Sequence, residues 1–543
     1  MIIVGINSSN HDGSVCLIKD GEVIFNIQEE RFNDIKHSPN VYLSLAKIKD
    51  YVDHIDVLAI SGISINYNPY SDIIKNLGKS FLNHEFKLYD FSNNHHMIHA
   101  ATAFYNSGFQ EALCIVKDGR GSQTGVFNNQ PTYEMSTTYE ASYPNNFKKV
   151  DQVSFYYKQE ESDFPSMKFV DGDHTITNSD SEAGAYDVFS KYLSLPLLEG
   201  AGKIMGMSAY GKENPNISLF TIDGMVNNKT FRAIADPDSL NFGGKISNDF
   251  TYTADIAYRL QKDIQDNVLK YILDMLKKTG QKSLCLSGGY FMNCVANYYF
   301  LDKIPKDIKI YIEPMSTDNG NALGVAKYAS FLHSASLIPV PQKSIYYGIK
   351  YNYSISDLIL EKTRAASKAD VANLLADKKI VAIYQGCSEA GYRALGNRSI
   401  LYDPRDPDGK DHVNTVKKRE WYRPFAGTVL FEKSKEWFNL KQLEESPYMM
   451  YAVDVLQNKK EIIPAITHVD GTCRVQTLKK DQNKNFYDLI QEFEKITGIP
   501  ILFNTSFNLA GHTMVETLKD ALWTLHNSDI DYLYLPELEV LVW

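Results

Sequence analysis

Three histidines lie within five positions at the start of the stretch NNHHMIHAATAFYNSGF, residues 93–109, whose remainder has an ordinary helical pattern. Residues four apart on a helix share one face at about 5–6 Å, a spacing that suits two imidazoles on one metal ion. His95 and His99 have this spacing, and His96 and His99, three apart, satisfy it less well. A polar helix start with one packed histidine is the alternative, so a metal site requires anionic partners.

Two aspartates are candidates for those partners. Asp118 in IVKDGRG and Asp318 in EPMSTDNGNALG each follow an apolar strand, and ligands of α/β sheets gather at the carboxyl ends of strands. Two imidazoles with two carboxylates suit iron, manganese or zinc better than calcium. Because each aspartate lies within two residues of a glycine, simple turn formation is the alternative explanation.

Two further stretches of the first half combine small and reactive residues. LSGGYFMN (286–293) allows the backbone to approach a ligand at a helix N-terminus, which favours phosphate or a nucleotide sugar, although tight packing explains the glycine pair equally well. His11 and Asp12 follow the first strand near the expected metal. They suit a general base or a group that positions an alcohol, and a turn histidine without a role is the alternative.

The second half concentrates arginine and lysine among glycines and small polar residues. Planar guanidinium groups bind phosphate and carboxylate with two hydrogen bonds, so the stretch predicts an anion site, against the alternative of a solvated basic face. Arg474 in HVDGTCRVQ, and Asn504 and Ser506, which face alike in FNTSFN, add donors. The basic residues that we single out between 389 and 427 are Arg393, Arg398, Arg405, Lys417, Lys418, Arg419 and Arg423.

The elements that must position these residues can be outlined. The opening MIIVGINSS predicts a strand, followed by a hairpin with a turn at Asp20-Gly21. Residues 112–127 repeat the device with a strand, a DGRGS turn and a return strand, and this echo of HDGS hints at an internal duplication. Loops and short strands are expected to about 180, and a long helix over 253–280, directly before the strand of LSGG.

Length and composition exclude several classes of protein. The chain has 543 residues with 44 % hydrophobic content, and prolines without periodicity near 335–355 divide it into expected domains 1–345 and 355–543. Its net charge of −10 argues against general nucleic-acid binding.

No apolar run approaches the roughly 18 residues of a membrane span and the start is unlike a signal peptide, so we expect a cytoplasmic protein without a membrane partner. Six scattered cysteines favour buried thiols over disulfides or zinc.

Taken together, these stretches resemble the NodU/CmcH family of O-carbamoyltransferases, which includes antibiotic enzymes acting on tobramycin, cephem and ansamycin substrates. The matches span nearly the whole chain in the expected order. They are GINSSNHDGS, EERFNDIKH, HxxxHA, GKIMGMSAYG, LSGGYFMN, STDNGNALG, GYRALGNRSIL, KKREWYRPFA, HVDGTCRVQ and GIPILFNTSFN.

The resemblance implies an α/β fold of two lobes. The first would be an actin-like, sugar-kinase-like ATPase lobe with duplicated RNase H-like halves, akin to the tRNA threonylcarbamoyl-transfer protein. The second would be a YrdC-like α/β lobe that forms carbamoyl-adenylate from carbamoyl phosphate and ATP. The first lobe would then transfer the carbamoyl group to a substrate hydroxyl.

The resemblance also implies roles for individual residues. The family metal, usually iron, would be held by His95, His99, Asp118 and Asp318, which selects His95 over His96, while His11 would lie near the acceptor hydroxyl with Asp12 beside it. Nucleotide contacts would come from Lys203, Ser287, Gly288, Gly289 and Asn293. The carbamoyl phosphate and adenylate pocket would comprise Arg393, Lys417, Arg423, Arg474, Asn504 and Ser506. One departure is Gly-Tyr-Arg at 391–393, where the family has Gly-Pro-Arg, and another is Arg120, which suits contact with phosphate or substrate.

The sequence therefore predicts an ATP-dependent O-carbamoyltransferase of natural-product or antibiotic biosynthesis. Its co-substrates would be ATP and carbamoyl phosphate, with Fe(2+) or another divalent metal, and its acceptor a small hydroxylated natural product or sugar. No nucleic-acid partner is expected, and a homodimer stays open. The alternatives are tRNA-directed carbamoyl transfer, which the acidic charge disfavours, and a nucleotide-gated binding or scaffold protein without transfer activity. Residues 130–200 carry no motif that names the acceptor.

Overall fold

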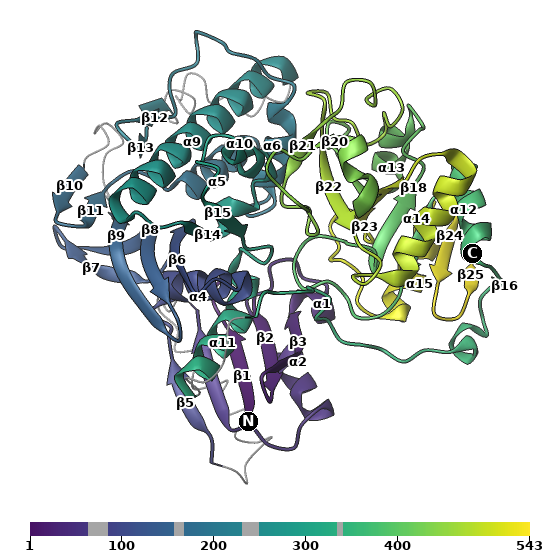
Figure 1. The fold of residues 1–543 in the computed structure, drawn as a ribbon, viewed down its shortest axis with the longest axis horizontal. Helices are drawn as coiled ribbons and strands as arrows, with labels where there is room; N and C mark the ends of the chain where they lie inside the picture. Colours follow the sequence, from purple (N-terminus) through teal and green to yellow (C-terminus); the bar gives the residue numbers. More distant parts are fainter. Residues whose placement is uncertain (63–84, 157–167, 228, 231–248, 334–339) are drawn as a thin grey trace. The chain divides into compact units, whose positions relative to one another are not determined.

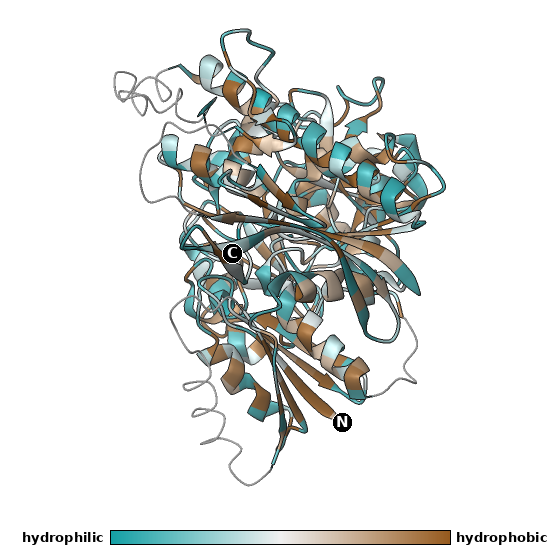
Figure 2. Ribbon diagram, turned by 90° about the vertical axis from the view of Figure 1, so that its left-hand side faces the viewer, coloured by the Kyte–Doolittle hydropathy of each residue, from teal (hydrophilic) through white to brown (hydrophobic). Residues whose placement is uncertain are grey.

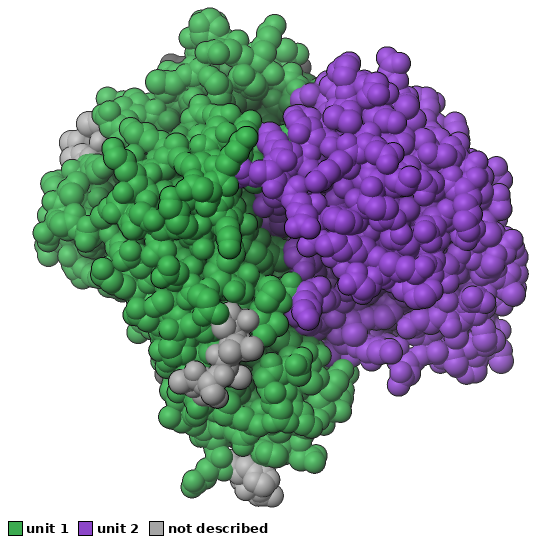
Figure 3. All heavy atoms as spheres, in the orientation of Figure 1, with its two compact units in different colours: residues 1–29, 37–342 green, residues 30–36, 343–543 purple. Residues whose placement is uncertain are grey.

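The computed structural model describes residues 1–62, 85–156, 168–227, 229–230, 249–333 and 340–543 (Figure 1). The chain forms two compact units, coloured separately in Figure 3. The first comprises residues 1–29 and 37–342, and the second comprises residues 30–36 and 343–543. The short segment 30–36 thus belongs to the second unit although it lies early in the sequence, a feature that the sequence analysis does not anticipate.

The first unit opens with the expected hairpin and strands. Within it, β2 is antiparallel to β1 and β3, while β4 is parallel to β1 and β5, which gives the order β3-β2-β1-β4-β5. Every residue of β1 is buried, as its central place in the sheet requires, and Figure 2 shows the hydrophobic colouring of these strands. The strands are β1 (Ile2–Asn7), β2 (Ser14–Lys19), β3 (Glu22–Gln28), β4 (Val57–Ser61) and β5 (Lys87–Asp90), with short helices α2 (Tyr42–Ala46) and η1 (Lys47–Asp50) after β3.

The same arrangement recurs in the second sheet of this unit. β8 is antiparallel to β6 and β9, and β14 is parallel to β6 and β15, so the core order β9-β8-β6-β14-β15 repeats the first sheet. This duplication confirms the actin-like class. The strands are β6 (Glu111–Lys117), β7 (Gln123–Phe127), β8 (Gln130–Ser142), β9 (Asn146–Tyr156), β10 (Lys168–Asp171), β11 (His174–Thr177), β14 (Ser283–Ser287) and β15 (Lys309–Ile312).

Two sequence predictions in this sheet were wrong in detail. β7 was expected to return along β6, but it pairs with β8, and β8 is the strand that returns beside β6. Residues 128–156 were expected to hold loops and short strands, yet β8 and β9 are 13 and 11 residues long. Their threonines, serines and tyrosines favour strands but give no clear apolar alternation, so the pattern hides them.

Each half of the first unit ends in a helix that packs on the sheet of the other half (Figure 1). α4 (His95–Ser107) follows β5 and packs against β6, β8 and β14, while α11 (Asn321–His333) follows β15 and packs against β1, β2 and β4. The two helices also cross closely. A Cβ at Gly324 would lie 1.9 Å from Thr102 Oγ1, so the crossing requires glycine. This exchange brings the start of α4 to the end of β6.

The remaining described helices of the unit lie between β11 and α11. The predicted long helix is α9, which begins after Asp249, whose side chain accepts a hydrogen bond from Tyr252 N, and ends at Gly280 in the left-handed conformation. The described elements are α5 (Glu182–Tyr192), α6 (Gly200–Ser208), α9 (Phe250–Thr279), η3 (Gly289–Met292), α10 (Cys294–Leu301) and η4 (Asp318–Gly320), with the small hairpin β12 (Thr221–Ile222) and β13 (Met225–Val226).

The second unit is built on one mixed sheet with the order β16-β25-β24-β17-β18-β23-β19-β22-β21-β20. Its strands are β16 (Thr363–Ala365), β17 (Val381–Tyr384), β18 (Arg398–Tyr402), β19 (Ala426–Leu430), β20 (Phe438–Asn439), β21 (Ala452–Val455), β22 (Thr472–Leu478), β23 (Ile501–Ser506), β24 (Tyr532–Leu535) and β25 (Val540–Val542). Its helices are α1 (Glu30–Asn33), η5 (Ile355–Leu358), α12 (Lys368–Ala376), α13 (Gly409–Val416), η6 (Phe431–Glu436), α14 (Lys484–Thr497) and α15 (Leu518–His526). The YrdC-like assignment of this unit stays a prediction.

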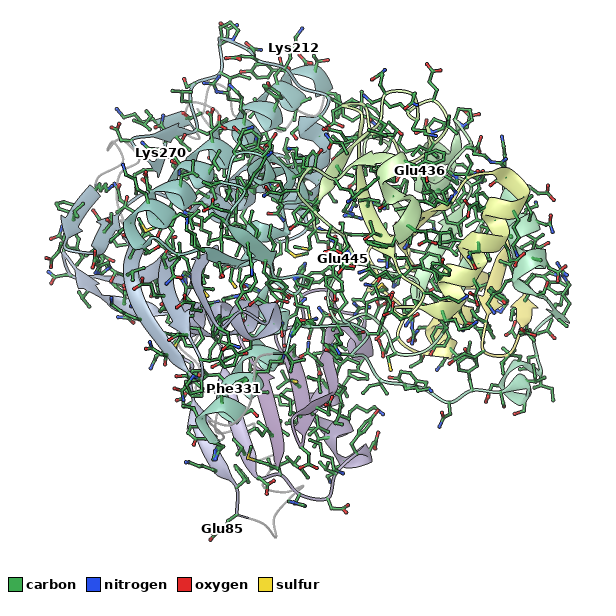
Figure 4. All side chains as sticks on the ribbon, viewed as in Figure 1. Glu85, Lys212, Lys270, Phe331, Glu436 and Glu445 are labelled. Carbon is green, nitrogen blue, oxygen red and sulfur yellow. The ribbon has the colours of Figure 1, made fainter. Side chains whose placement is uncertain are left out.

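Aromatic packing fixes the back of α4 and α11. Phe331, labelled in Figure 4, stacks on Tyr105 with ring centroids 4.5 Å apart.

All six cysteines are unbridged, and five of them are buried, as the sequence predicts. In the part of the chain that the structure describes, no helix combines the length and the apolar character that a membrane crossing needs.

Candidate active site

The first turn of α4 presents two imidazoles to one point. His95 and His99 are both fully buried, and their Nε2 atoms lie 3.1 Å apart. His96 points elsewhere, because its Nδ1 lies 2.8 Å from Thr137 Oγ1, and burial lowers the pKa of this imidazole well below its usual value. The geometry therefore separates the pair at spacing four from the third histidine.

The two aspartates come from loops that follow β6 and β15 and meet this pair. Asp118 Oδ2 lies 3.3 Å from His95 Nε2, and Asp318 Oδ1 lies 3.3 Å from His95 Nε2 and 3.2 Å from His99 Nε2. The four ligand atoms all lie within 4.8 Å of one another. We call His95, His99, Asp118 and Asp318 the metal-ligand cluster.

The second oxygen of each carboxylate is held by the protein. Asp118 Oδ1 accepts a hydrogen bond from Gly289 N at 3.0 Å, and Asp318 Oδ2 accepts one from Ser9 Oγ at 3.1 Å. Each aspartate can therefore turn one oxygen toward a cation while the other fixes its orientation. Nitrogen and oxygen donors in this number fit a divalent transition metal.

The charges within the cluster act on one another's pKa values. Burial disfavours ionisation of Asp318, but the charges of His95 and His11 outweigh it and hold the pKa of this carboxyl well below its usual range. Burial lowers the pKa of His95, yet the charge of Asp318 raises it to a net value of about 10. Without a cation the cluster therefore binds protons, which metal binding would release.

The loop after β1 connects His11 to the same place. Ser9 Oγ bonds both Asp318 Oδ2 and the carbonyl of His11, at 3.1 and 2.7 Å. His11 Nδ1 lies 3.1 Å from Asp12 Oδ2, and Asp12 Oδ1 lies 2.7 Å from His37 Nδ1. The His11 side chain keeps about a third of its surface exposed. Although burial lowers the pKa of His11, the charge of Asp318 and the contacts of Asp12 raise it to about 9.

His37 is a site residue that the sequence analysis did not single out. It belongs to the motif EERFNDIKH, and its contact with Asp12 fixes the carboxylate that orients His11. Contacts with both histidines outweigh burial and lower the pKa of Asp12 to about 2. The contact between Asp12 and His37 could not be foreseen from the sequence, because the two residues lie 25 positions apart.

The glycine pair of LSGG forms a tight turn beside Asp118. Gly288 has φ of +97°, and a Cβ there would lie 2.2 Å from the carbonyl oxygen of Lys117. Gly289 donates its backbone N–H to Asp118, as described above. Ser287 ends β14 and is buried. The turn thus holds a metal ligand, and its proposed contact with nucleotide stays a prediction.

Asn293 and Lys203 have positions that also bear on this turn. Asn293 caps α10 by accepting from Ala296 N at 3.0 Å, and its Nδ2 donates to Tyr186 Oη and Gln261 Oε1 at 3.1 and 2.9 Å. These contacts assign it at least a structural role. Lys203 lies on α6 and is buried. Arg120, in the loop after Asp118, stacks on the ring of Tyr133 at 4.5 Å.

A buried carboxylate beneath the Asp318 loop was missed by the sequence analysis. Glu313 Oε1 accepts from Met315 N at 2.9 Å, and Glu313 Oε2 accepts from Asn106 Nδ2 at 2.9 Å. Lys327 Nζ donates to Asn106 Oδ1 at 2.6 Å, which joins the loop to both crossing helices. Burial raises the pKa of Glu313 to about 7 and lowers the pKa of Lys327 to about 8.

Replacing Glu313 by glutamine should change how stability depends on pH. Between about pH 4.5 and 7 the folded wild type keeps a proton that the unfolded chain has lost, so its free energy of unfolding falls as the pH rises. Over this window the fall is on the order of 3 kcal/mol, at about 1.4 kcal/mol per pKa unit. Urea unfolding at pH 4.5 and 7.5 should show a flatter profile for Glu313→Gln. Equal profiles for the two proteins would contradict the assignment.

The second unit gathers part of its basic stretch on one face of its sheet. Arg474 on β22 and Asn504 on β23 lie on either side of Ala426, the residue of β19 that is paired with both. Asn504 Nδ2 donates to Thr428 Oγ1 and to the carbonyl of Ala394, at 2.9 and 3.3 Å. The loop that carries Arg393 therefore adjoins the same face.

Lys417, Arg419, Arg423 and Arg474 form what we call the cation cluster. Burial lowers the pKa of Lys417 well below its usual value, and the charges of Arg419 and Arg423 lower it further. Burial likewise lowers the pKa of Arg419, with Arg423 and Arg474 adding to the effect. Lys417 Nζ bonds the carbonyl oxygens of Ser506 and Asn508, and Glu420 Oε2 lies 3.4 Å from Arg423 Nη1. Like charges held together in this way favour a bound anion.

Two arginines of the same stretch serve the fold instead. Arg398 is fully buried, and its guanidinium donates to the carbonyls of Gln385 and Glu516, at 2.5 and 3.1 Å. Arg405 pairs with Asp403 at 2.6 Å. The sequence alone does not separate these two from the cation cluster.

Comparisons with known proteins agree with this layout. The chain matches the family model described as Carbamoyltransferase N-terminus over residues 67–327 and that described as Carbamoyltransferase C-terminus over residues 372–541. It is 31 % identical to nodulation protein NolNO of Sinorhizobium fredii, over 97 % of this chain and 78 % of that protein. It is 25 % identical to 3'-hydroxymethylcephem-O-carbamoyltransferase of Amycolatopsis lactamdurans, over 96 % of this chain and 95 % of that protein.

Solved structures give weaker matches. HypF of T. kodakarensis is 13 % identical, with a TM-score of 0.38, over 61 % of this chain and 47 % of that chain. Both regions of the chain match carbamoyltransferase models, so the protein is an enzyme of this class. More narrowly, the chain belongs to the NodU/CmcH carbamoyltransferase family, as its similarity to NolNO shows.

Proposed function

We propose that the protein is an ATP-dependent O-carbamoyltransferase that forms carbamoyl-adenylate from carbamoyl phosphate and ATP and transfers the carbamoyl group to an alcohol. The observation that carries the proposal is the cation cluster, where one buried and three half-buried like charges favour an anion such as phosphate. In the proposed reaction water attacks carbamoyl phosphate and phosphate leaves, the resulting carbamate attacks the α-phosphorus of ATP, and pyrophosphate leaves. AMP is released when the acceptor hydroxyl attacks the carbamoyl carbon.

The residues of the second unit suit the first of these steps. Carbamate is a poor electrophile, and adenylation supplies a good leaving group. Arg423 and Arg474 neutralise the phosphate charge that develops, while Asn504 adds a buried amide beside them. Lys417, held by the carbonyls of the 506–508 segment, keeps its ammonium group next to these arginines. We expect Arg393 to contribute from the adjoining loop.

The residues of the first unit suit the transfer step. The metal-ligand cluster would hold a divalent cation, Fe(2+) in our proposal, which when bound supplies Lewis-acid polarisation at the reacting centre. Asp12 fixes one nitrogen of the His11 ring, so the other nitrogen can orient the acceptor hydroxyl. Ser287, Gly288 and Gly289 would meet the adenylate at the turn beside Asp118, with Lys203 nearby on α6.

We propose a small hydroxylated natural product or sugar as the acceptor. The Amycolatopsis relative is named for transfer to a hydroxymethylcephem, which is such an alcohol. The net charge of −10 disfavours tRNA as the acceptor, because phosphate contacts require a basic surface.

The full-length protein should convert carbamoyl phosphate and ATP to products in the presence of Fe(2+). We expect pyrophosphate release without an acceptor, and acceptor-dependent AMP release with a panel of sugars and polyols, where mass spectrometry detects the carbamate ester. Carbamoylation of tRNA alone would favour the tRNA-directed alternative. If neither pyrophosphate nor AMP forms under any of these conditions, the proposal is wrong and a binding or scaffold role is favoured.

A further inference from the structure

Residues 30–36 lie between two stretches of the first unit in the sequence but belong to the second unit in the structure. They follow β3 and precede α2, both of which belong to the first unit, but they form part of the second (Figure 3). The segment contains α1 and the residues RFNDIK of the motif EERFNDIKH. A segment that only connected β3 to α2 along the surface would not need the buried contacts that residues 30–36 make.

Arg31 carries the first of these contacts. It is buried, with a relative exposure of 5 %, and its Nη2 donates to the carbonyl oxygens of Gly391 and Glu389, at 2.6 and 3.5 Å. Its Nη1 donates to the carbonyl of Met514 at 3.3 Å. A guanidinium that bonds several carbonyls at once fixes their relative positions. The loop that it fixes continues directly to Arg393.

The same loop is also held by two buried carboxylates, Glu389 and Glu516. Glu389 Oε1 accepts from the backbone N–H groups of Leu395 and Asn397, at 2.7 and 2.9 Å. Glu516 Oε2 accepts from Ser388 Oγ at 2.6 Å. Residues 388–397 are therefore fixed by Glu389 within the loop, by Glu516 from a later part of the chain and by Arg31 from the first half of the sequence.

Asp34 ties the segment to the chain beyond β23. Its Oδ2 lies 2.6 Å from His512 Nδ1, and its Oδ1 accepts from Thr513 N at 2.9 Å. Thr513 Oγ1 donates back to the carbonyl of Glu30 at 3.2 Å. Asn508 donates through Nδ2 to the carbonyl of His512, and its own carbonyl accepts a hydrogen bond from Lys417 Nζ. The segment thus braces two backbone regions that adjoin the cation cluster.

Lys36 adds a charge at the end of the segment. It lies two residues after Asp34, which is bonded to His512 and Thr513. Its charge adds to burial and to the charges of Arg419 and Arg423 in lowering the pKa of Lys417. It is half-buried rather than extended into solvent. A cation contributed in this way adds to the field that attracts a phosphate.

We propose that residues 30–36 form part of the carbamoyl phosphate site of the second unit, with Arg31 as a positioning residue for the Arg393 loop and Lys36 as a source of positive charge. This inference rests on the proposed function. It implies that the pocket is composite in sequence, so that a segment encoded within the transfer unit completes the adenylate-forming unit. A phosphate-bearing co-substrate is the ligand class concerned.

The test measures carbamoyl phosphate-dependent pyrophosphate release by the full chain. Lys36→Glu should raise KM for carbamoyl phosphate about tenfold with kcat little changed, and lower ionic strength should enlarge the difference. Lys49→Glu, an exposed lysine on η1 of the first unit, is the matched charge control and should leave KM unchanged.

Arg31 is tested by graded substitution. Arg31→Met should lower kcat/KM for carbamoyl phosphate more than tenfold, Arg31→Lys should restore part of it, and Arg364→Met on exposed β16 should have no effect. Thermal unfolding identifies an Arg31 variant that fails to fold. In that case the KM of Lys36→Glu for carbamoyl phosphate decides whether the inference holds. Wild-type kcat/KM values for carbamoyl phosphate in both Lys36→Glu and Arg31→Met would overturn the inference. An inactive wild type would instead count against the proposed function.

Discussion

Replacing Asp318 by asparagine is expected to lower carbamoyl transfer at least about 100-fold, because loss of an outer partner of a metal ligand alone costs 10–100-fold. Asp318 Oδ1 lies within 3.3 Å of both imidazoles, and its other oxygen is fixed by Ser9. Asparagine keeps the shape but removes the charge that a divalent cation requires. Metal content measured by mass spectrometry should fall together with the rate of acceptor carbamoylation.

The same variant should separate the chemistry of the two units. Pyrophosphate release from ATP and carbamoyl phosphate should survive in Asp318→Asn, because the cation cluster belongs to the second unit and contains no cluster ligand. Asp307→Asn, at an exposed aspartate that pairs with Lys282, is the control and should retain metal and transfer. Full metal content and a normal transfer rate in Asp318→Asn would mean that the four residues do not bind the metal.

The sequence predicted most reliably what is local. The strands around Asp20-Gly21 follow from alternation and turn chemistry, and the start of α4 follows from helical periodicity with histidines at spacing four. The pairing of β7 with β8 depends on which strand competes for β6, so the sequence could not reveal it. The exchange of α4 and α11 is equally non-local, since it rests on a close crossing at Gly324.

The residues of the candidate site likewise divide into those that the sequence could predict and those that depend on distant contacts. Two strand-end aspartates could be proposed as partners of His95 and His99 because parallel strands deliver their carboxyl ends to one edge. Glu313 and His37 were missed, because a single carboxylate or imidazole becomes meaningful only when distant residues bury and contact it. The resemblance to the family supplied what the pattern alone left open, including the choice between His95 and His96.

Replacing Arg474 by alanine is expected to lower kcat/KM for carbamoyl phosphate about 10- to 100-fold, since a hydrogen bond to a charged group contributes about 1.5–3 kcal/mol. The free energy of unfolding should stay equal or rise. The reason is that Arg474 lies among like charges and, after burial and Arg423, is a further cause of the lowered pKa of Arg419. Steady-state pyrophosphate release and urea unfolding of the same preparation measure both quantities.

The matched control for Arg474 is Arg405, which should show the opposite signature. Arg405 bonds Asp403 at 2.6 Å, and Asp403 is 1 % exposed, so Arg405→Ala leaves a buried carboxylate without its cation. Breaking such a pair costs about 3–5 kcal/mol in buried settings, less here because Arg405 is about a third exposed. Its KM for carbamoyl phosphate should not change. If Arg474→Ala loses stability but keeps its kinetics, Arg474 is structural and the anion lies elsewhere.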